Sequence, residues 1–198
     1  MASGGRGAAC RAILAAALFL VVVAPACART IELRYTPFAA DGSLRDGLHA
    51  TPAFGGACST GSFLVGGPGV FRCFEASFIH DPCYLDAGAG NAVRAVVVCV
   101  ETPWSRNVLR LRVRAPLDAR YGTGFGGPLW ALRLASGRRC VLVGGATTVV
   151  AGRRMNYACG RRYLFGSPDR TRPTWRIRQA LTPAGAGLRK VAIAAAWR

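Results

Sequence analysis

Apolar and polar residues alternate along most of the chain from Ile31 onward, and a period of two predicts β-strands. The alternation is strict over residues 109–114 and recurs over residues 129–135 and 175–178. In each segment the apolar side chains fall on one face and arginines on the other, as in a strand with one buried side. The arginines on the polar faces are Arg110, Arg112, Arg114, Arg133, Arg176 and Arg178.

Two further segments predict strands from different evidence. Residues 94–100 form a nearly continuous β-branched run, which suits a strand that is buried on both faces. Residues 188–197 alternate like a strand, although their alanines would also suit a short helix. A glycine–alanine stretch before them, and the many strands nearby, favour the strand.

Glycine and proline separate the predicted strands. Ser136-Gly137 and Ala151-Gly152 are typical of tight hairpin turns. Asp81-Pro82 and residues 167–169 predict loops. Residues 36–69 are rich in Gly, Ser, Thr and Pro and show little periodicity, so we expect a long loop region there, held by disulfides.

Together these elements predict an all-β protein, an antiparallel sandwich or open barrel with long disulfide-pinned loops. Residues 29–198 have the length of a single domain. The glycine-rich residues 122–127 lack the GxGxxG register and precede a predicted strand, so we interpret them as a connector.

The first 28 residues predict an export signal. Arg6 and Arg11 form a basic region without acids, the apolar run Ala12–Ala24 follows, and Ala26-Cys27-Ala28 supplies small residues for signal peptidase. The apolar run is shorter than the roughly 20 residues that a membrane-spanning helix needs. We therefore expect a secreted protein. Alternatively, residues 24–27 resemble a bacterial lipobox, and a lipid on Cys27 would anchor the protein to the outer membrane leaflet.

The cysteines indicate a disulfide framework. Removal of the signal takes away Cys10 and Cys27 and leaves six of the eight cysteines. An even number outside the cytosol indicates disulfides. A metal site is disfavoured because no CxxC occurs and only His49 and His80 could add imidazole ligands. The sequence does not fix the connectivity, but sequential pairing closes loops of hairpin size: Cys58–Cys73, Cys83–Cys99 and Cys140–Cys159.

The third bridge conflicts with a regular meander. If residues 138–159 formed three consecutive hairpin strands, Cys140 and Cys159 would lie two strands apart, beyond the Cα separation of about 4.4–6.8 Å that a disulfide tolerates. If residues 144–153 protrude as one loop instead, the outer strands pair directly and Cys140 faces roughly Tyr157. Cys159 is then a diagonal neighbour, and we favour this arrangement.

Several motifs stand out between residues 54 and 178: Arg72-Cys73-Phe74, Ile79–Tyr84, Trp130-Ala131-Leu132, Gly137–Leu142, Asn156–Gly160 and Pro173-Thr174-Trp175. Together they resemble those of uncharacterised secreted proteins of high-GC Gram-positive (actinobacterial) bacteria. The resemblance supports an exported protein with paired cysteines and implies no assigned activity. The presence of 25 arginines against the single Lys190 agrees with GC-rich codons.

The net charge points to anionic partners. The whole chain carries +17, and without Arg6 and Arg11 it keeps 24 basic and 9 acidic residues, a net charge of +15. Such a charge attracts polyanions. For an exported protein we expect an anionic cell-wall polymer or a membrane surface as the partner, and no nucleic acid, with the six strand arginines as candidate contacts. Alternatively, codon usage alone produces a solvated basic surface.

Candidate catalytic residues are few. His80-Asp81 is the one adjacent acid–histidine pair, and His80 could act as a general base near neutral pH. Adjacent strand residues point to opposite faces, however, so a structural role is favoured. No GxSxG, HExxH or phosphate-binding glycine loop occurs, and we expect no metal or other cofactor. A glycosidase-like carboxylate pair would have to come from Glu32, Asp41, Asp46, Glu75, Asp81, Asp86, Glu101, Asp118 and Asp169.

These observations favour an exported, non-catalytic binding or interaction module at the cell envelope, attracted to anionic polymers or lipids. Two alternatives stay open. One is a secreted hydrolase that acts on a wall glycan or ester through His80 or a loop carboxylate. The other is a protease-inhibitor-like protein with a disulfide-pinned exposed loop. The sequence leaves the oligomeric state open.

Overall fold

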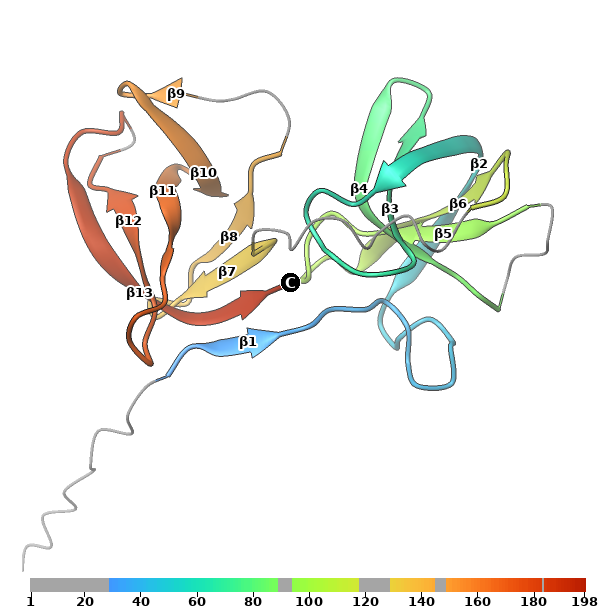
Figure 1. Cartoon of the computed structure of the whole chain (residues 1–198), viewed down its shortest axis with the longest axis horizontal. Coiled ribbons are helices and arrows are strands. Elements are labelled where there is room, and N and C mark those ends of the chain that lie inside the picture. Colours follow the sequence, from blue (N-terminus) through green and yellow to red (C-terminus); the bar gives the residue numbers. More distant parts are fainter. Residues whose placement is uncertain (1–28, 89–93, 118–128, 145–148, 183) are drawn as a thin grey trace, which may run out of the picture.

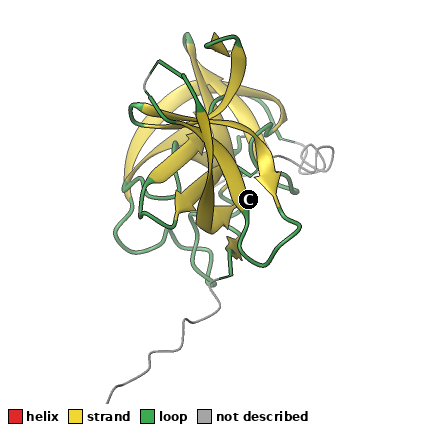
Figure 2. Cartoon of the chain, turned by 90° about the vertical axis from the view of Figure 1, so that its left-hand side faces the viewer, coloured by secondary structure: helices red, strands yellow, loops and turns green. Residues whose placement is uncertain are grey.

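The computed structural model describes residues 29–88, 94–117, 129–144, 149–182 and 184–198 (Figure 1). Within them every regular element is a strand, as Figure 2 shows, so the predicted all-β class is confirmed. No helix of these residues could span a membrane. The predicted export signal, the connector 122–127 and Asp118 lie outside the described residues.

The first barrel, on the right in Figure 1, is a closed sheet of five strands in the order β2-β3-β4-β5-β6. Parallel pairing of β2 with β6 closes it. Gly56 permits this closure, because a Cβ there would lie 2.4 Å from Cδ2 of the fully buried Leu111. The strands are β2 (His49–Gly61), β3 (Val70–Glu75), β4 (Phe78–Leu85), β5 (Val96–Cys99) and β6 (Asn107–Val113).

The second barrel is built from the C-terminal strands and closes through antiparallel pairing of β13 with β7. Two short strands lie outside this ring: β9 pairs with the start of β10, and β1 pairs in parallel with the end of β13. The strands are β1 (Ile31–Leu33), β7 (Ala131–Leu134), β8 (Arg139–Leu142), β9 (Val149–Val150), β10 (Arg153–Cys159), β11 (Arg162–Asp169), β12 (Arg176–Ala180) and β13 (Leu188–Trp197).

Thr30 lies between the start of β12 and the start of β1, along the same edge of β13. Its hydroxyl donates to the Ile193 carbonyl oxygen at 2.6 Å and accepts the Trp175 N–H at 2.8 Å. Its own N–H donates to the Pro173 carbonyl oxygen at 2.9 Å. The buried Thr30 therefore continues the hydrogen bonding of the second barrel between two separate strands.

An apolar cluster joins the two barrels. Trp130, which is 1% exposed, packs with valines on the outer face of the first barrel and with Tyr35 from the segment between β1 and β2. The Tyr35 and Trp130 ring centroids lie 5.3 Å apart, and Tyr35 lies 5.8 Å from Tyr84. The buried members are Val65, Val70, Tyr84, Val98, Val100, Val108 and Trp130.

The predicted alternation is observed in the strands. In β6 the side chains of Leu111 and Val113 are buried, while those of Arg110 and Arg112 on the opposite face are exposed. All four residues of β5 are buried, as expected for a strand covered on both faces. Residues 188–197 form a strand, and Gly137, with a φ of 83°, lies in the predicted turn between β7 and β8.

Three loop predictions are wrong. Residues 36–69 contain the long strand β2, which is mostly exposed and rich in small residues and therefore lacks a clear apolar period. Asp81-Pro82 lies inside β4, where the Pro82 carbonyl oxygen still accepts a hydrogen bond from the Val100 N–H at 3.0 Å. Residues 167–169 belong to β11, although its pairing with β12 is irregular there.

The cysteines pair sequentially, as the spacing favours: Cys58–Cys73, Cys83–Cys99 and Cys140–Cys159. Each bridge joins two strands of one barrel, so the disulfides hold the sheets together where we expected them to pin loops. All of these sulfur atoms are therefore engaged in covalent bonds.

The conflict over the third bridge has a simple resolution. β8 pairs directly with the second half of β10, while β9 pairs with its first half, so the bridge and the Ala151-Gly152 hairpin coexist. The expected register is wrong: Tyr157 lies opposite Leu142 and not opposite Cys140. Continuing the same register places Cys140 directly opposite Cys159.

Candidate functional site

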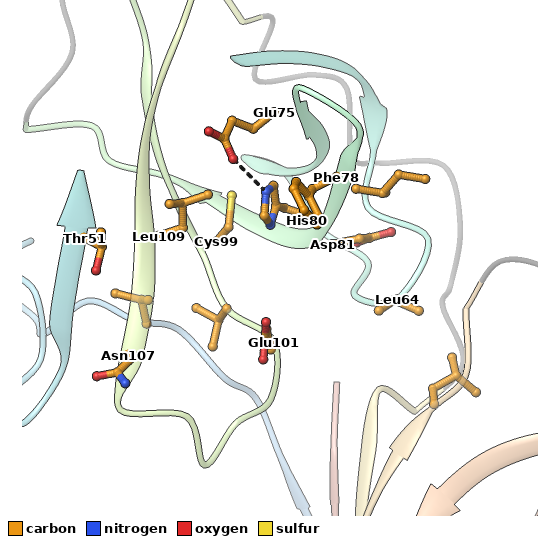
Figure 3. Close-up of a pocket in the computed structure, with 14 residues that line it drawn as sticks. Thr51, Leu64, Glu75, Phe78, His80, Asp81, Cys99, Glu101, Asn107 and Leu109 are labelled. Carbon is orange, nitrogen blue, oxygen red and sulfur yellow. Dashed lines mark ion pairs between the residues drawn. The ribbon is translucent and has the colours of Figure 1, made fainter. Parts of the chain in front are cut away.

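A cavity of about 540 Å³ lies at one end of the first barrel (Figure 3). The starts of β2, β4 and β6 and the ends of β3 and β5 surround it, and Leu142 of the second barrel completes its wall. Barrel mouths and contacts between barrels are common places for ligands. Its polar lining residues are Thr51, Glu75, His80, Asp81, Glu101 and Asn107.

His80 and Glu75 form a pair inside this cavity. His80 Nε2 lies 3.7 Å from Glu75 Oε2, the contact drawn in Figure 3. Within the described residues the buried Nε2 atom has no hydrogen-bond partner. Because His80 and Asp81 bind different groups, they do not act as a His–Asp pair.

Asp81 is held by the segment that follows β2. Ser62 Oγ donates a short hydrogen bond to Asp81 Oδ1, and the Phe63 N–H donates to Oδ2 at 3.0 Å. Ser62 Oγ also accepts the N–H groups of Leu64 and Val65. Asp81 therefore fixes the end of β2 beside the cavity.

Burial raises the pKa of Asp81, although hydrogen bonds from Ser62 and Phe63 oppose the shift. The folded protein thus binds this proton more tightly than the unfolded chain, and the resulting stability is lost as the pH rises through the folded pKa. The asparagine in Asp81→Asn does not titrate. We therefore expect the unfolding free energy of the wild type minus that of this variant to fall as the pH rises from about 4. Denaturant titrations at several pH values measure this difference.

Asp41→Asn is the control for this titration. Hydrogen bonds from Ser43 lower the pKa of the exposed Asp41, so the corresponding difference should have the opposite sign. A rise with pH in the Asp81 comparison would contradict the assignment.

The other polar side chains of the cavity have no partner in the described part of the protein. Glu101, Asn107 and Thr51 make no side-chain hydrogen bond or ion pair there. None of the described lining residues is an arginine or lysine, although the chain carries 26 such residues. The cavity is therefore locally acidic in a strongly basic protein.

A basic groove lies on the outside of the second barrel. It consists of two neighbouring cavities of about 320 and 240 Å³ that share Asp169, Arg176 and Lys190. Asp169 is the single acid among its described lining residues; the carboxylate lies 3.5 Å from Lys190 Nζ, and hydrogen bonds from Thr171 lower its pKa. The cations that line the basic groove are Arg153, Arg172, Arg176, Arg178 and Lys190.

Strand register places like charges together in the basic groove. Arg178 lies directly opposite Lys190 across β12 and β13. Like charges in such a cross-strand pair repel one another and destabilise the sheet. A bound anion would remove this repulsion, whereas Asp169 alone cannot neutralise five cations.

The structure distributes the six arginines expected to bind anions over separate places. Arg176 and Arg178 share the basic groove. On the first barrel, Arg110 pairs with Asp86 at 2.8 Å and Arg112 lies over the Phe54 ring at 5.5 Å.

The two remaining arginines lie elsewhere. Arg114 follows β6, and its N–H donates to the Gly56 carbonyl oxygen at 2.9 Å. Arg133 lies opposite Arg139 in the pairing of β7 with β8.

Most described acids outside the cavity have partners. Glu32 pairs with Arg198 at 2.8 Å, and Asp41 accepts hydrogen bonds from Ser43. The three carboxylates that the structure brings together are Glu75, Asp81 and Glu101, around the cavity.

One cluster of described cysteines has metal-like spacing. The Sγ atoms of Cys73, Cys83 and Cys99 lie within 4.8 Å of one another. All three are in disulfides, so none offers a thiolate.

Sequence reasoning missed Arg153, Arg172 and Lys190 in the basic groove, and Thr51 and Asn107 in the cavity. Their positions depend on the register between strands, which local alternation does not give. One local feature of the sequence could have indicated the basic groove: Lys190 lies at an exposed position of β13, on its polar face. No protein-family model, curated protein or solved structure matches the chain.

Proposed function

We propose that this chain is an exported binding protein that attaches to an anionic, phosphate-bearing polymer of the cell envelope through the basic groove. The observation that carries the proposal is the convergence of five cations around one acid, with Arg178 and Lys190 directly opposed. Guanidinium groups bind phosphate with paired N–H donors. Three disulfides suit an oxidising compartment outside the cytosol.

The shape of the basic groove favours a polymer over a flat membrane. Its two cavities adjoin one another, so a polymer chain can place successive phosphates beside Arg178 and Arg172. A bilayer presents its headgroups in a plane and does not enter the two cavities. Binding to anionic vesicles in preference to wall polymer would therefore contradict this part of the proposal.

The test is binding to purified cell wall over a series of salt concentrations. Release of counterions predicts affinity that falls steeply as salt rises. We expect the triple variant Arg176→Gln/Arg178→Gln/Lys190→Gln to bind at least about tenfold more weakly at low salt, with a shallower salt dependence.

A charge-matched control separates the basic groove from the net charge. The variant Arg112→Gln/Arg114→Gln/Arg133→Gln also removes three cations, all outside the groove. It should retain most of the affinity. Equal losses in both variants would assign binding to net charge alone, and no binding of the wild type at low salt would overturn the proposal.

A secreted hydrolase is a second candidate, favoured by the occurrence of His80 and Glu75 in one cavity. In that case His80 would act as a general base for water, with Glu75 orienting it. Turnover of a wall glycan or ester that disappears in His80→Ala would establish this activity. Turnover that persists in His80→Ala would exclude His80 as the base.

A further inference from the structure

The acidic cavity at the mouth of the first barrel differs in charge from the rest of the molecule. We propose that it is a second binding site, selective for a primary ammonium group on a short apolar chain. This inference is independent of the basic groove, because the two sites share no residue and would select ligands of opposite charge.

The polar groups of the cavity favour a ligand that donates hydrogen bonds. Glu75 and Glu101 are acceptors, and Thr51 and Asn107 can accept as well as donate. His80 Nε2, buried and without a hydrogen-bond partner among the described residues, accepts a hydrogen bond when the neutral ring carries its proton on Nδ1. An ammonium group offers three N–H donors and a positive charge, which suits this set.

Charge excludes the opposite class of ligand. A carboxylate or phosphate in the cavity would meet Glu75 and Glu101, and none of the described lining residues is an arginine or lysine that would offset their repulsion. The chain as a whole carries a surplus of cations, so the acidic character of the cavity is a local property.

The apolar side chains of the lining suit the alkyl chain of the proposed ligand. Leu64, Val108 and Leu142 form part of the wall. Phe78 and Ile79, which are 65% and 53% exposed, lie at its edge near the tip of the β3–β4 hairpin. An alkyl chain that covers these side chains removes apolar surface from water. The volume, about 540 Å³, lies in the range of small-molecule sites, roughly 300–1,000 Å³.

The test is titration of the folded protein with hexylamine, followed by calorimetry and by NMR. Hexan-1-ol and hexanoate have the same apolar chain without the positive charge. We expect hexylammonium to bind at least about tenfold more tightly than either, since a charge-assisted hydrogen bond contributes roughly 1.5–3 kcal/mol, which is about tenfold or more in affinity.

Variants assign the binding to the cavity. Glu75→Gln and Glu101→Gln keep the shape of the side chain and remove its charge, and each should weaken hexylammonium binding about tenfold. Asp41→Asn removes an exposed carboxylate that does not line the cavity and should leave binding unchanged. If Glu75→Gln fails to fold, hexylammonium binding by Glu101→Gln tests the proposal alone, because Glu101 is exposed and its replacement should not affect folding.

A second arm identifies the source of the ammonium group. Nα-acetyl-lysine N-methylamide presents it as a peptide side chain and hexylamine as a free amine, so tighter binding of the first indicates a protein partner. Equal binding of hexanoate, absence of hexylammonium binding, or unchanged affinity in Glu101→Gln would overturn the proposal.

Discussion

Replacing Trp130 by alanine is expected to lower the free energy of unfolding by about 3–5 kcal/mol, the range for deletion of a buried aromatic side chain. Trp130 is 1% exposed and packs between the two barrels, with its ring 5.3 Å from that of Tyr35. Its removal leaves a cavity that neither closed sheet can easily collapse to fill. Denaturant unfolding followed by circular dichroism measures the loss.

The same variant tests whether the barrels unfold together. Because Trp130 belongs to the cluster shared by both barrels, its loss should weaken their coupling and broaden or split the unfolding transition. Phe54→Ala is the control: Phe54 is 68% exposed, so the change should cost no more than about 0.5 kcal/mol. A loss below about 1 kcal/mol in Trp130→Ala would contradict the role given to this cluster.

Removal of the Cys83–Cys99 disulfide is the second large effect. We expect Cys83→Ala/Cys99→Ala to lower the free energy of unfolding by about 2–5 kcal/mol. The bridge spans a sequence separation of 16 residues, for which the chain-entropy model gives about 3 kcal/mol, and both cysteines are buried in the first barrel. Chemical denaturation of the double variant and of the wild type measures the difference.

Both cysteines must be replaced together. A lone Cys99 thiol would lie within 4.8 Å of Cys73 Sγ and could attack the Cys58–Cys73 bridge by thiol–disulfide exchange. Mass mapping under non-reducing conditions checks that the double variant keeps its other two bridges. Wild-type protein with two or more free thiols, or a double variant of wild-type stability, would contradict the prediction.

Local alternation was sufficient to predict β6, β7, β12 and β13. Leu109–Val113 and Trp130–Leu134 each have one apolar face that must be buried, so their period of two is visible without any knowledge of the partner strands. β2 was missed because its exposed face carries small residues and its apolar contribution to the core is weak. Pro82 was read as a loop signal, although β4 accommodates it beside β5.

The candidate sites depended on information that the sequence pattern does not contain. Arg178 and Lys190 are close only because β12 and β13 pair in one particular register. Glu75, His80 and Glu101 line one cavity only because five strands close into a barrel and bring their ends to one mouth. The charges were visible in the sequence, whereas the closure that sorts them into an acidic cavity and a basic groove was not.

The position of Thr30 has a consequence for the order of folding. Its hydroxyl binds the Ile193 carbonyl oxygen, a contact across 163 positions of the chain. Contacts of long sequence separation form late, because closing a long loop costs entropy before the contact contributes stability. The hairpins of the first barrel can form from a chain that is still emerging, but the edge of β13 stays open until Thr30, β1 and β13 have come together. Completion of the second barrel is therefore the last step, and the unpaired edge is the surface at which incomplete molecules would associate.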